Sequence, residues 1–323
     1  MTKPTPPAES YETRATSHRR SKDTLLLVAK VGITVVSFYV ISRSVSWGGA
    51  LRSLVDLRIG WFGAAIFIFW VAQIVSSVRC AYVARGLSGE LDLETSVRAH
   101  FAGLWFNQVL PTGLGGDMVK IAKLKSRLGL SIATRAAVLD RVSGLMMLLF
   151  ALTIQLPLYP VYFDNPHWLT SIGLASSAIL VSIVAISGVA NSVTQQFRLP
   201  FGVRHLGNLM ADVWTFRKGR LFWQQFWTSL VVHFNGIACF ALIAQSMGIH
   251  VDLILLVLAV PVVFVAALFP VSFAGWGVRE AGAIWIFGTI GIPKESALGM
   301  SVGFGILLLI AGLPGLLVWA LNK

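Results

Sequence analysis

An apolar part of the chain is interrupted by the sequence Asn107-Gln-Val-Leu-Pro111-Thr-Gly113-Leu-Gly115-Gly116-Asp117-Met-Val-Lys120. A second interruption, later in the chain, is the sequence Phe269-Pro270-Val-Ser-Phe-Ala-Gly275-Trp276-Gly277-Val-Arg279-Glu280. Each proline removes a backbone donor and clashes with the preceding helical turn. Lipid tolerates irregular backbone only where it is buried in protein or lines a cavity. We therefore expect both breaks to lie inside the protein and to mark a binding site.

The composition around these breaks is that of a polytopic α-helical membrane protein. Of the 323 residues, 56% are hydrophobic and 12% are charged, whereas a soluble domain carries about 25% charged residues. Spans of about 20 residues each use up nearly the whole length, so no soluble catalytic domain is expected. The net charge of +12 is explained by basic residues in cytoplasmic loops beside anionic lipid heads. We expect no nucleic-acid partner.

Hydropathy predicts six full spans, at 25–43, 61–83, 131–156, 168–189, 223–247 and 297–320. The broken segment 99–127 lies between the second and third spans, and the broken segment 252–291 lies between the fifth and sixth. Residues 1–24 are polar and charged, which predicts a disordered cytoplasmic tail. The apolar stretch after this tail ends without a small-residue cleavage site, so we interpret it as a retained span. Residues 25–323 then form a single transmembrane domain.

Basic residues in short loops predict the orientation of the spans. They are frequent in the tail, in 191–222 and directly after the first break, whereas 157–167 and 248–253 contain no Lys or Arg. This pattern predicts that both termini are cytoplasmic. The connection 44–60 disagrees, because Arg52 and Arg58 would then face outward.

Under this topology each half consists of two spans, a re-entrant segment and a further span. The halves, approximately 25–157 and 168–321, then have opposite orientations. The predicted fold class is an all-α integral membrane protein with about six transmembrane helices and two re-entrant or broken segments in an inverted repeat. Broken helices at matching positions of two such halves are typical of the binding site of secondary transporters.

Ionisable side chains at membrane depth are costly and by default mark a site. In this sequence they are Arg79, Asp117, Lys120, Arg135, Asp140, Arg141, Arg279 and Glu280. About two positive charges remain even with full internal pairing, which favours an anionic ligand such as a phosphate or carboxylate. Backbone N–H groups near Gly115, Gly116, Gly275 and Gly277 would add further donors.

Structural roles remain open for several of these residues. Arg79 and Arg135 lie near predicted span ends, where their side chains could reach the membrane surface. Lys120 also fits an amphipathic surface helix. Asp140 and Arg141 are adjacent and point to different faces, so each needs a partner on another helix, and that partnership could be purely structural.

No catalytic or metal-binding motif accompanies these charges. Cys80 and Cys239 both fall in apolar spans and are interpreted as small buried hydrophobic residues. The six histidines lack metal-ligand spacing, and we expect no cofactor and no enzymatic activity. Asn107 could cap the broken backbone or contact a ligand, and the sequence does not separate these roles.

The motifs resemble those of the lysylphosphatidylglycerol synthase transmembrane (flippase-like) family, from about residue 25 to the end. Pro111-Thr-Gly-Leu-Gly-Gly-Asp117-Met-Val-Lys120 is similar to the family's Pro-Thr-Gly-x-Gly-Gly-Asp-x-x-Arg, with lysine in place of the usual arginine. Ala137-Val-Leu-Asp140-Arg141 resembles its Asp/Glu-Arg pair, and Pro270 through Glu280 resembles its Pro-x-x-x-x-Gly-x-Gly-x-Arg-Glu.

The resemblance implies a bacterial inner-membrane protein related to the flippase half of the enzymes that make and translocate aminoacylated phosphatidylglycerol. The expected function is translocation of a membrane lipid with an anionic or zwitterionic head. The expected substrate-binding residues are Asn107, Pro111, Gly115, Gly116, Asp117, Lys120, Asp140, Arg141, Pro270, Gly275, Gly277, Arg279 and Glu280. One alternative is a non-transporting partner of a lipid-modifying or envelope-biogenesis enzyme. Another is an intramembrane transferase with Glu280 or Asp140 as base.

Overall fold

The computed structural model describes residues 28, 31–32, 34–36, 39–41, 43, 57–87, 89–110, 115–196, 200–268 and 275–321. Within these ranges the regular secondary structure is helical, which confirms the predicted all-α class. The tail 1–24, Pro111 and Pro270 lie outside the described residues, as does much of the predicted first span 25–43.

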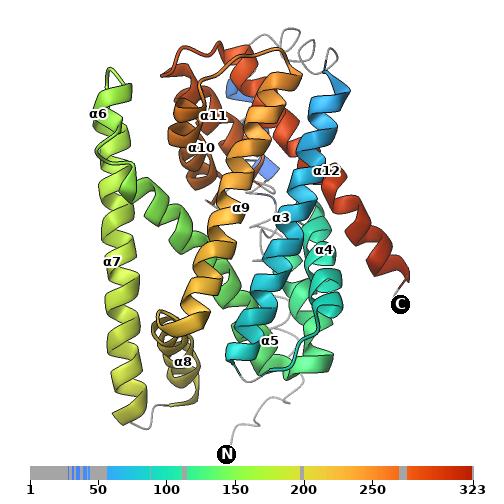
Figure 1. Cartoon of the computed structure of the whole chain (residues 1–323), viewed down its shortest axis with the longest axis vertical. Helices are drawn as coiled ribbons and strands as arrows, with labels where there is room; N and C mark the ends of the chain where they lie inside the picture. The colour runs from blue at the N-terminus through green and yellow to red at the C-terminus, as the bar shows by residue number, and fades with distance from the viewer. Residues whose placement is uncertain are drawn as a thin grey trace, which may run out of the picture.

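Figure 1 labels the helices of the described residues in the order in which they occur in the chain. They are α3 (Ile59–Gly86), α4 (Leu93–Val109), α5 (Gly115–Ile154), α6 (Tyr159–Tyr162), α7 (His167–Gln196), α8 (Phe201–Thr215), α9 (Gly219–Ser246), α10 (Leu253–Leu268), α11 (Val278–Gly288) and α12 (Lys294–Leu321). Among them α3, α5, α7, α9 and α12 are long and apolar enough to cross a membrane. These five correspond to the predicted second to sixth spans.

Helix α5 begins earlier than the predicted third span because it joins two helical pieces. The pieces meet at Gly129, whose φ of 72° and ψ of 159° are not helical. Glycine adopts a positive φ at little cost because it lacks a Cβ atom. The first piece therefore belongs to the first broken segment, and only the piece after Gly129 forms the span.

Each broken segment folds as two helices on either side of the break. α4 with the first piece of α5 occupies the lower half of Figure 1, and α10 with α11 occupies the upper half. α4 begins at Asp92, whose carboxylate accepts a hydrogen bond from the backbone N–H of Thr95 at 2.9 Å. That bond holds the pKa of Asp92 below its usual range. The two broken segments therefore lie towards opposite ends of the bundle.

Helices α3 and α9 run side by side at the centre of the bundle (Figure 1), and α3 contributes residues to both of two hydrophobic clusters. In one cluster the Phe240 ring of α9 stacks on Phe304 of α12 at 4.7 Å and also contacts Phe287 of α11. The other cluster joins α3, α4, α5 and the end of α8, with Cys80 fully buried within it. Cys239 is also fully buried, so both cysteines pack as predicted.

The broken segment of the first half packs closely on the last span of the second half. A Cβ atom at Gly315 of α12 would overlap the backbone carbonyl of Phe101 in α4. One turn earlier, a Cβ atom at Gly312 would approach the backbone of Trp105 within 3.3 Å. Membrane helices associate through small residues that let backbones approach, so these glycines fix the contact between the two halves.

We predict that Gly315→Ala destabilises the protein by about 1–3 kcal/mol, because the added methyl group forces α12 away from α4. The thermal unfolding midpoint in detergent, followed by tryptophan fluorescence, measures the change. Gly63→Ala in α3 is the matched control, since a Cβ atom there meets no atom within 4 Å. Equal midpoints for the two variants would contradict the close approach.

Candidate functional site

A buried carboxylate, Asp140 of α5, holds two cations from different parts of the chain. It accepts hydrogen bonds from Arg79 Nε of α3 and from Lys120 Nζ at the start of α5, each at 2.7 Å. Arg79, Lys120 and Asp140 are only 5%, 4% and 6% exposed. The interpretation that Arg79 reaches the membrane surface is therefore wrong, and so is the surface-helix alternative for Lys120.

The turn at Gly129 makes this arrangement possible. Twenty residues of straight helix extend about 30 Å, which would keep Lys120 and Asp140 far apart. Because the chain reverses at Gly129, the first piece of α5 runs beside the span and the two side chains meet. The broken segment is thereby tied to the span that follows it.

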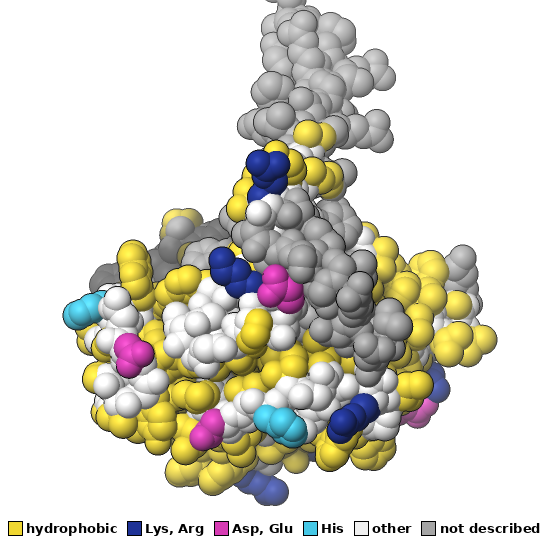
Figure 2. All heavy atoms as spheres, turned by 90° about the horizontal axis from the view of Figure 1, so that it is seen from above, with side chains coloured by type: hydrophobic (Ala, Val, Ile, Leu, Met, Phe, Trp, Pro, Cys, Tyr) yellow, Lys and Arg dark blue, Asp and Glu magenta, His cyan; other side chains and the backbone are white. Residues whose placement is uncertain are grey.

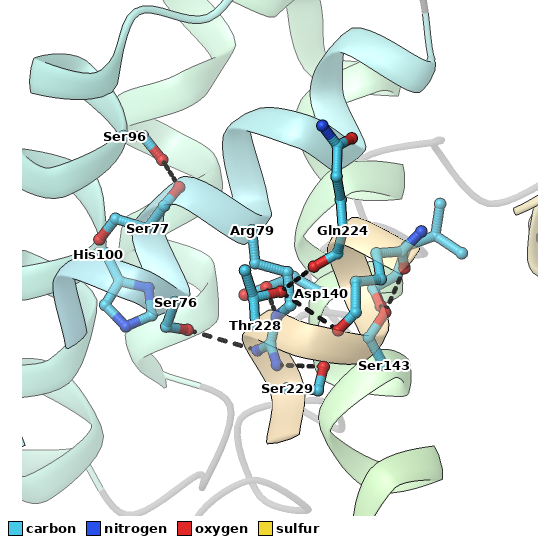
Figure 3. A network of polar contacts seen from close by, with 12 residues as sticks. Ser76, Ser77, Arg79, Ser96, His100, Asp140, Ser143, Gln224, Thr228 and Ser229 are labelled. Atoms are coloured by element: carbon cyan, nitrogen blue, oxygen red, sulfur yellow. Dashed lines mark hydrogen bonds and ion pairs between the residues drawn. The ribbon is translucent and has the colours of Figure 1, made fainter. Parts of the chain in front are cut away.

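Neutral polar groups complete this cluster (Figure 3). Arg79 donates from Nη1 to Ser229 Oγ of α9 at 2.9 Å, and from Nη2 to Ser76 Oγ at 3.3 Å. His100 of α4 lies 3.5 Å from Lys120 Nζ and 2.9 Å from Gln73 Oε1. Ser229, His100 and Gln73 were not among the residues expected at the site. The only feature of the sequence that could have indicated them is the presence of polar residues among apolar ones.

Arg141 follows Asp140 but has a different partner, as expected for adjacent residues on one helix. Its guanidinium pairs with Asp117, at the start of α5, at 2.7 Å. The Arg141 side chain is 48% exposed and that of Asp117 26% exposed. Arg135, also expected to reach the surface, instead makes a two-point contact with Asp212 of α8. The first piece of α5 is thus connected to the following span by two ion pairs.

The second break carries its own buried ion pair at the start of α11. Arg279 Nη2 donates to Glu280 Oε1 at 2.6 Å, and Ser301 of α12 donates to the same oxygen at 3.2 Å. The other carboxylate oxygen of Glu280 accepts the backbone N–H of Gly277, whose φ is 89°. Arg279 also lies over the Trp276 ring, 4.8 Å from its centre. Arg279 and Glu280 are adjacent and pair with each other, whereas the adjacent Asp140 and Arg141 have different partners.

Asn107 caps the helix that follows the first break. Its Oδ1 accepts a hydrogen bond from the backbone N–H of Gly116 at 3.0 Å. A Cβ atom at Gly116 would overlap the Gly103 carbonyl and the Asn107 side chain, and one at Gly115 would meet Leu110. Of the two roles considered for Asn107, the structure supports the cap. Gly115 and Gly116 permit close packing around it.

An inner cavity of about 230 Å³ borders the cluster around Asp140, since Arg79 is part of its wall. Its wall includes Arg79 and Ser229 on one side and Phe304, whose ring centre is 5.9 Å from the Arg279 guanidinium, on the other. The rest of the lining contains the polar side chains Gln73, His233 and Asn235 together with apolar ones such as Phe69, Leu148 and Phe264. The buried Nε2 atom of His233 has no hydrogen-bond partner among the described residues. Buried polar atoms normally have a protein or water partner, so this cavity suits water or a polar ligand.

The charge next to this cavity is positive. Arg79 and Lys120 carry two positive charges against the single negative charge of Asp140. The Arg279–Glu280 pair and the Arg141–Asp117 pair are each neutral in sum. The charged residues of the predicted site therefore fall into three groups. Arg79, which was not among the expected substrate-binding residues, joins the group of Lys120 and Asp140 and borders the cavity with an excess positive charge.

We predict that Asp140→Asn lowers stability by about 3–5 kcal/mol, because it leaves two buried cations without a counter-charge. The thermal midpoint in detergent should fall clearly. Asp164→Asn, at an exposed carboxylate, is the matched control and should change stability by about 0.5 kcal/mol or less. An Asp140→Asn midpoint equal to that of the wild type would show that the carboxylate does not hold Arg79 and Lys120 in the interior.

Comparison with known proteins agrees with this geometry. The model of the family described as lysylphosphatidylglycerol synthase TM region matches residues 27–315, which is most of the chain and contains all three motifs. This match confirms the resemblance inferred from those motifs, and it associates the chain with lipid-related processes in a membrane. A search of curated proteins finds no match. The chain belongs to the family of lysylphosphatidylglycerol synthase transmembrane regions.

Proposed function

We propose that the protein translocates a lipid with an anionic head group between the leaflets of a membrane. The observation that carries the proposal is the excess positive charge of the Arg79, Lys120 and Asp140 cluster at the wall of the inner cavity. Membership of a lipid-related membrane family supports it. A positively charged cavity inside the bundle would bind and stabilise an anionic head while it crosses the hydrocarbon layer.

Arg79 is the residue that binds the head in this proposal. Its planar guanidinium presents several N–H donors at once, which matches the oxygens of a phosphate or carboxylate. One N–H group is held by Asp140 and others by serine hydroxyls. A serine hydroxyl is a weaker acceptor than an anion, so an incoming phosphate can displace Ser229 or Ser76 while Asp140 keeps the guanidinium in place.

The other charged residues of the breaks hold the site together. Lys120 and Arg279 are each bound by a carboxylate at less than 3 Å. In this proposal they contribute positive electrostatic potential and hold the shape of the site, and they offer the ligand few free hydrogen-bond donors. Rocking of one half against the other around the cavity would alternate its access between the two leaflets. The close contact between α4 and α12 at Gly312 and Gly315 is one of the places where the two halves meet.

The same proposal places the α8 end of the bundle in the cytoplasm of a bacterial cell and the protein in its inner membrane. The end of α3, the turn of α5 and the start of α9 lie at that end with Arg85, Arg127 and Arg220. Figure 2 views the opposite end, where charged and histidine side chains are scattered among hydrophobic ones. An excess of Lys and Arg at one end is typical of the cytoplasmic side.

Arg79→Gln is the sharpest test, because it removes the excess charge and leaves Asp140 paired with Lys120. We expect the variant to fold and to lose about tenfold or more of its transport, since a hydrogen bond to a charged group is worth about 1.5–3 kcal/mol. The assay uses purified protein in liposomes that contain lipids with fluorescent anionic or zwitterionic heads. Accessibility to an external quencher reports movement between leaflets.

Arg85→Gln is the matched control, since this arginine lies on the same helix but is exposed. It should transport at the wild-type rate. Failure of wild-type, folded protein to move any anionic lipid would contradict the proposed function. Head-selective transport that survives Arg79→Gln would instead exclude Arg79 as the residue that binds the head.

A further inference from the structure

A second cavity, the side groove, lies on the other face of the contact between α5 and α9. It measures about 290 Å³ and is walled by side chains of α5, α7 and α9 and by residues at the end of α8. Most of its wall is hydrophobic, with Met146 and Phe150 of α5 and Leu180 and Val184 of α7 among the lining residues. Ligand pockets in proteins measure about 300–1,000 Å³, so the groove is near the lower end of that range.

Ser229 belongs to the walls of both cavities. Its hydroxyl accepts the hydrogen bond from Arg79 Nη1 at 2.9 Å, and two further polar groups adjoin it on the groove side. These are Ser143 and Gln225, which are hydrogen-bonded to each other. The inner cavity and the side groove are thus neighbours across a short polar partition. On one side of it is a buried guanidinium, and on the other is a hydrophobic wall.

The α8 end of the groove carries a second cation. Arg217 lines the groove, and its guanidinium lies 3.5 Å from the centre of the Trp214 ring. Tryptophan and arginine together at a helix end are typical of the membrane–water interface. The groove therefore has an interfacial cation at one end, a hydrophobic wall along its length and a polar partition towards Arg79.

A hydrophobic wall with polar groups and a cation beside it suits the hydrocarbon chain and the anionic head of one membrane lipid. We infer that the side groove binds a hydrocarbon chain of the same lipid whose anionic head reaches Arg79, so that the lipid gains access laterally between α7 and α9. This inference rests on the proposed function. Arg217 contacts the head at the membrane surface. The polar side chains of Ser143, Gln225 and Ser229 then bind the head as it moves from the groove towards Arg79. The chain stays against Met146 and Phe150 throughout.

Photo-crosslinking of the full-length protein in vesicles tests the inference directly. The probes are phosphatidylglycerol and phosphatidylcholine, each with a diazirine in one acyl chain, and a polyprenyl phosphate with the same group in its chain. We expect an anionic probe to label the α5 and α9 peptides that line the groove. Stronger labelling by the straight acyl chain or by the polyprenyl chain identifies which kind of chain the groove takes.

Val184→Trp fills the groove from α7, and Val181→Trp on the same helix is its control. Val184 lines the groove, whereas Val181 is 67% exposed and is not part of its wall. We expect Val184→Trp to reduce groove labelling by about tenfold, since exclusion of even a few buried methylene groups has that effect on occupancy. Val181→Trp should label as the wild type does. Equal thermal midpoints of the two variants in detergent show that both are folded.

The two proposals fail in different ways. Groove labelling without any head-selective transport would overturn the proposed translocation and leave the chain-binding groove in place. Head-selective transport with an unlabelled groove, or with Val184→Trp labelling and transporting as the wild type does, would overturn the groove assignment alone. Labelling confined to the exposed faces of α7 would also overturn it.

Discussion

The fold depends on the cost of placing charge where water is absent. A charged side chain inside a bilayer needs a partner, and here the carboxylate of Asp140 provides one for both Arg79 and Lys120. Those two cations come from a span and from a broken segment, so a single acidic group fixes the position of three parts of the chain. Breaking such a buried pair costs about 3–5 kcal/mol. The helices beside the two breaks are held by these pairs and by close glycine contacts.

The same constraint organises the space inside the bundle. The inner cavity borders the cluster around Asp140, and the side groove lies behind the partition that contains Ser229. The side groove is almost wholly hydrophobic, whereas the inner cavity has both hydrophobic and polar side chains beside the buried Arg79 guanidinium. A protein that binds an amphiphile needs such a gradient, because the two parts of the ligand prefer different surroundings.

Hydropathy and proline act locally, so the sequence was enough to predict the five spans that the described residues contain and the interruption of the helices near 111 and 270. The prediction for Arg79 was wrong because distance from a predicted span end does not say whether that end faces lipid or protein. α3 continues to Gly86, which places Arg79 within the helix and against α5. The pairing of Lys120 with Asp140 depends on the reversal at Gly129, and nothing near either residue in the sequence indicates that contact. The pairing within Arg279–Glu280 depends on the first turn of α11 and on Ser301, which is more than 20 residues away. The cavities arise from how whole helices pack, so a single sequence does not reveal them.

The distribution of ion pairs between the halves has a consequence for how the chain enters a membrane. Asp117 and Asp140 are bound by Arg141, Arg79 and Lys120, all within the first half, and Glu280 is bound by Arg279 within the second. These three carboxylates are therefore paired within their own half, whereas Asp212 of the second half pairs with Arg135 of the first. Domains and repeats generally fold as units during synthesis, with the N-terminal unit first. The first half can thus be inserted before the second is made without exposing an unpaired Asp117 or Asp140 carboxylate to the lipid.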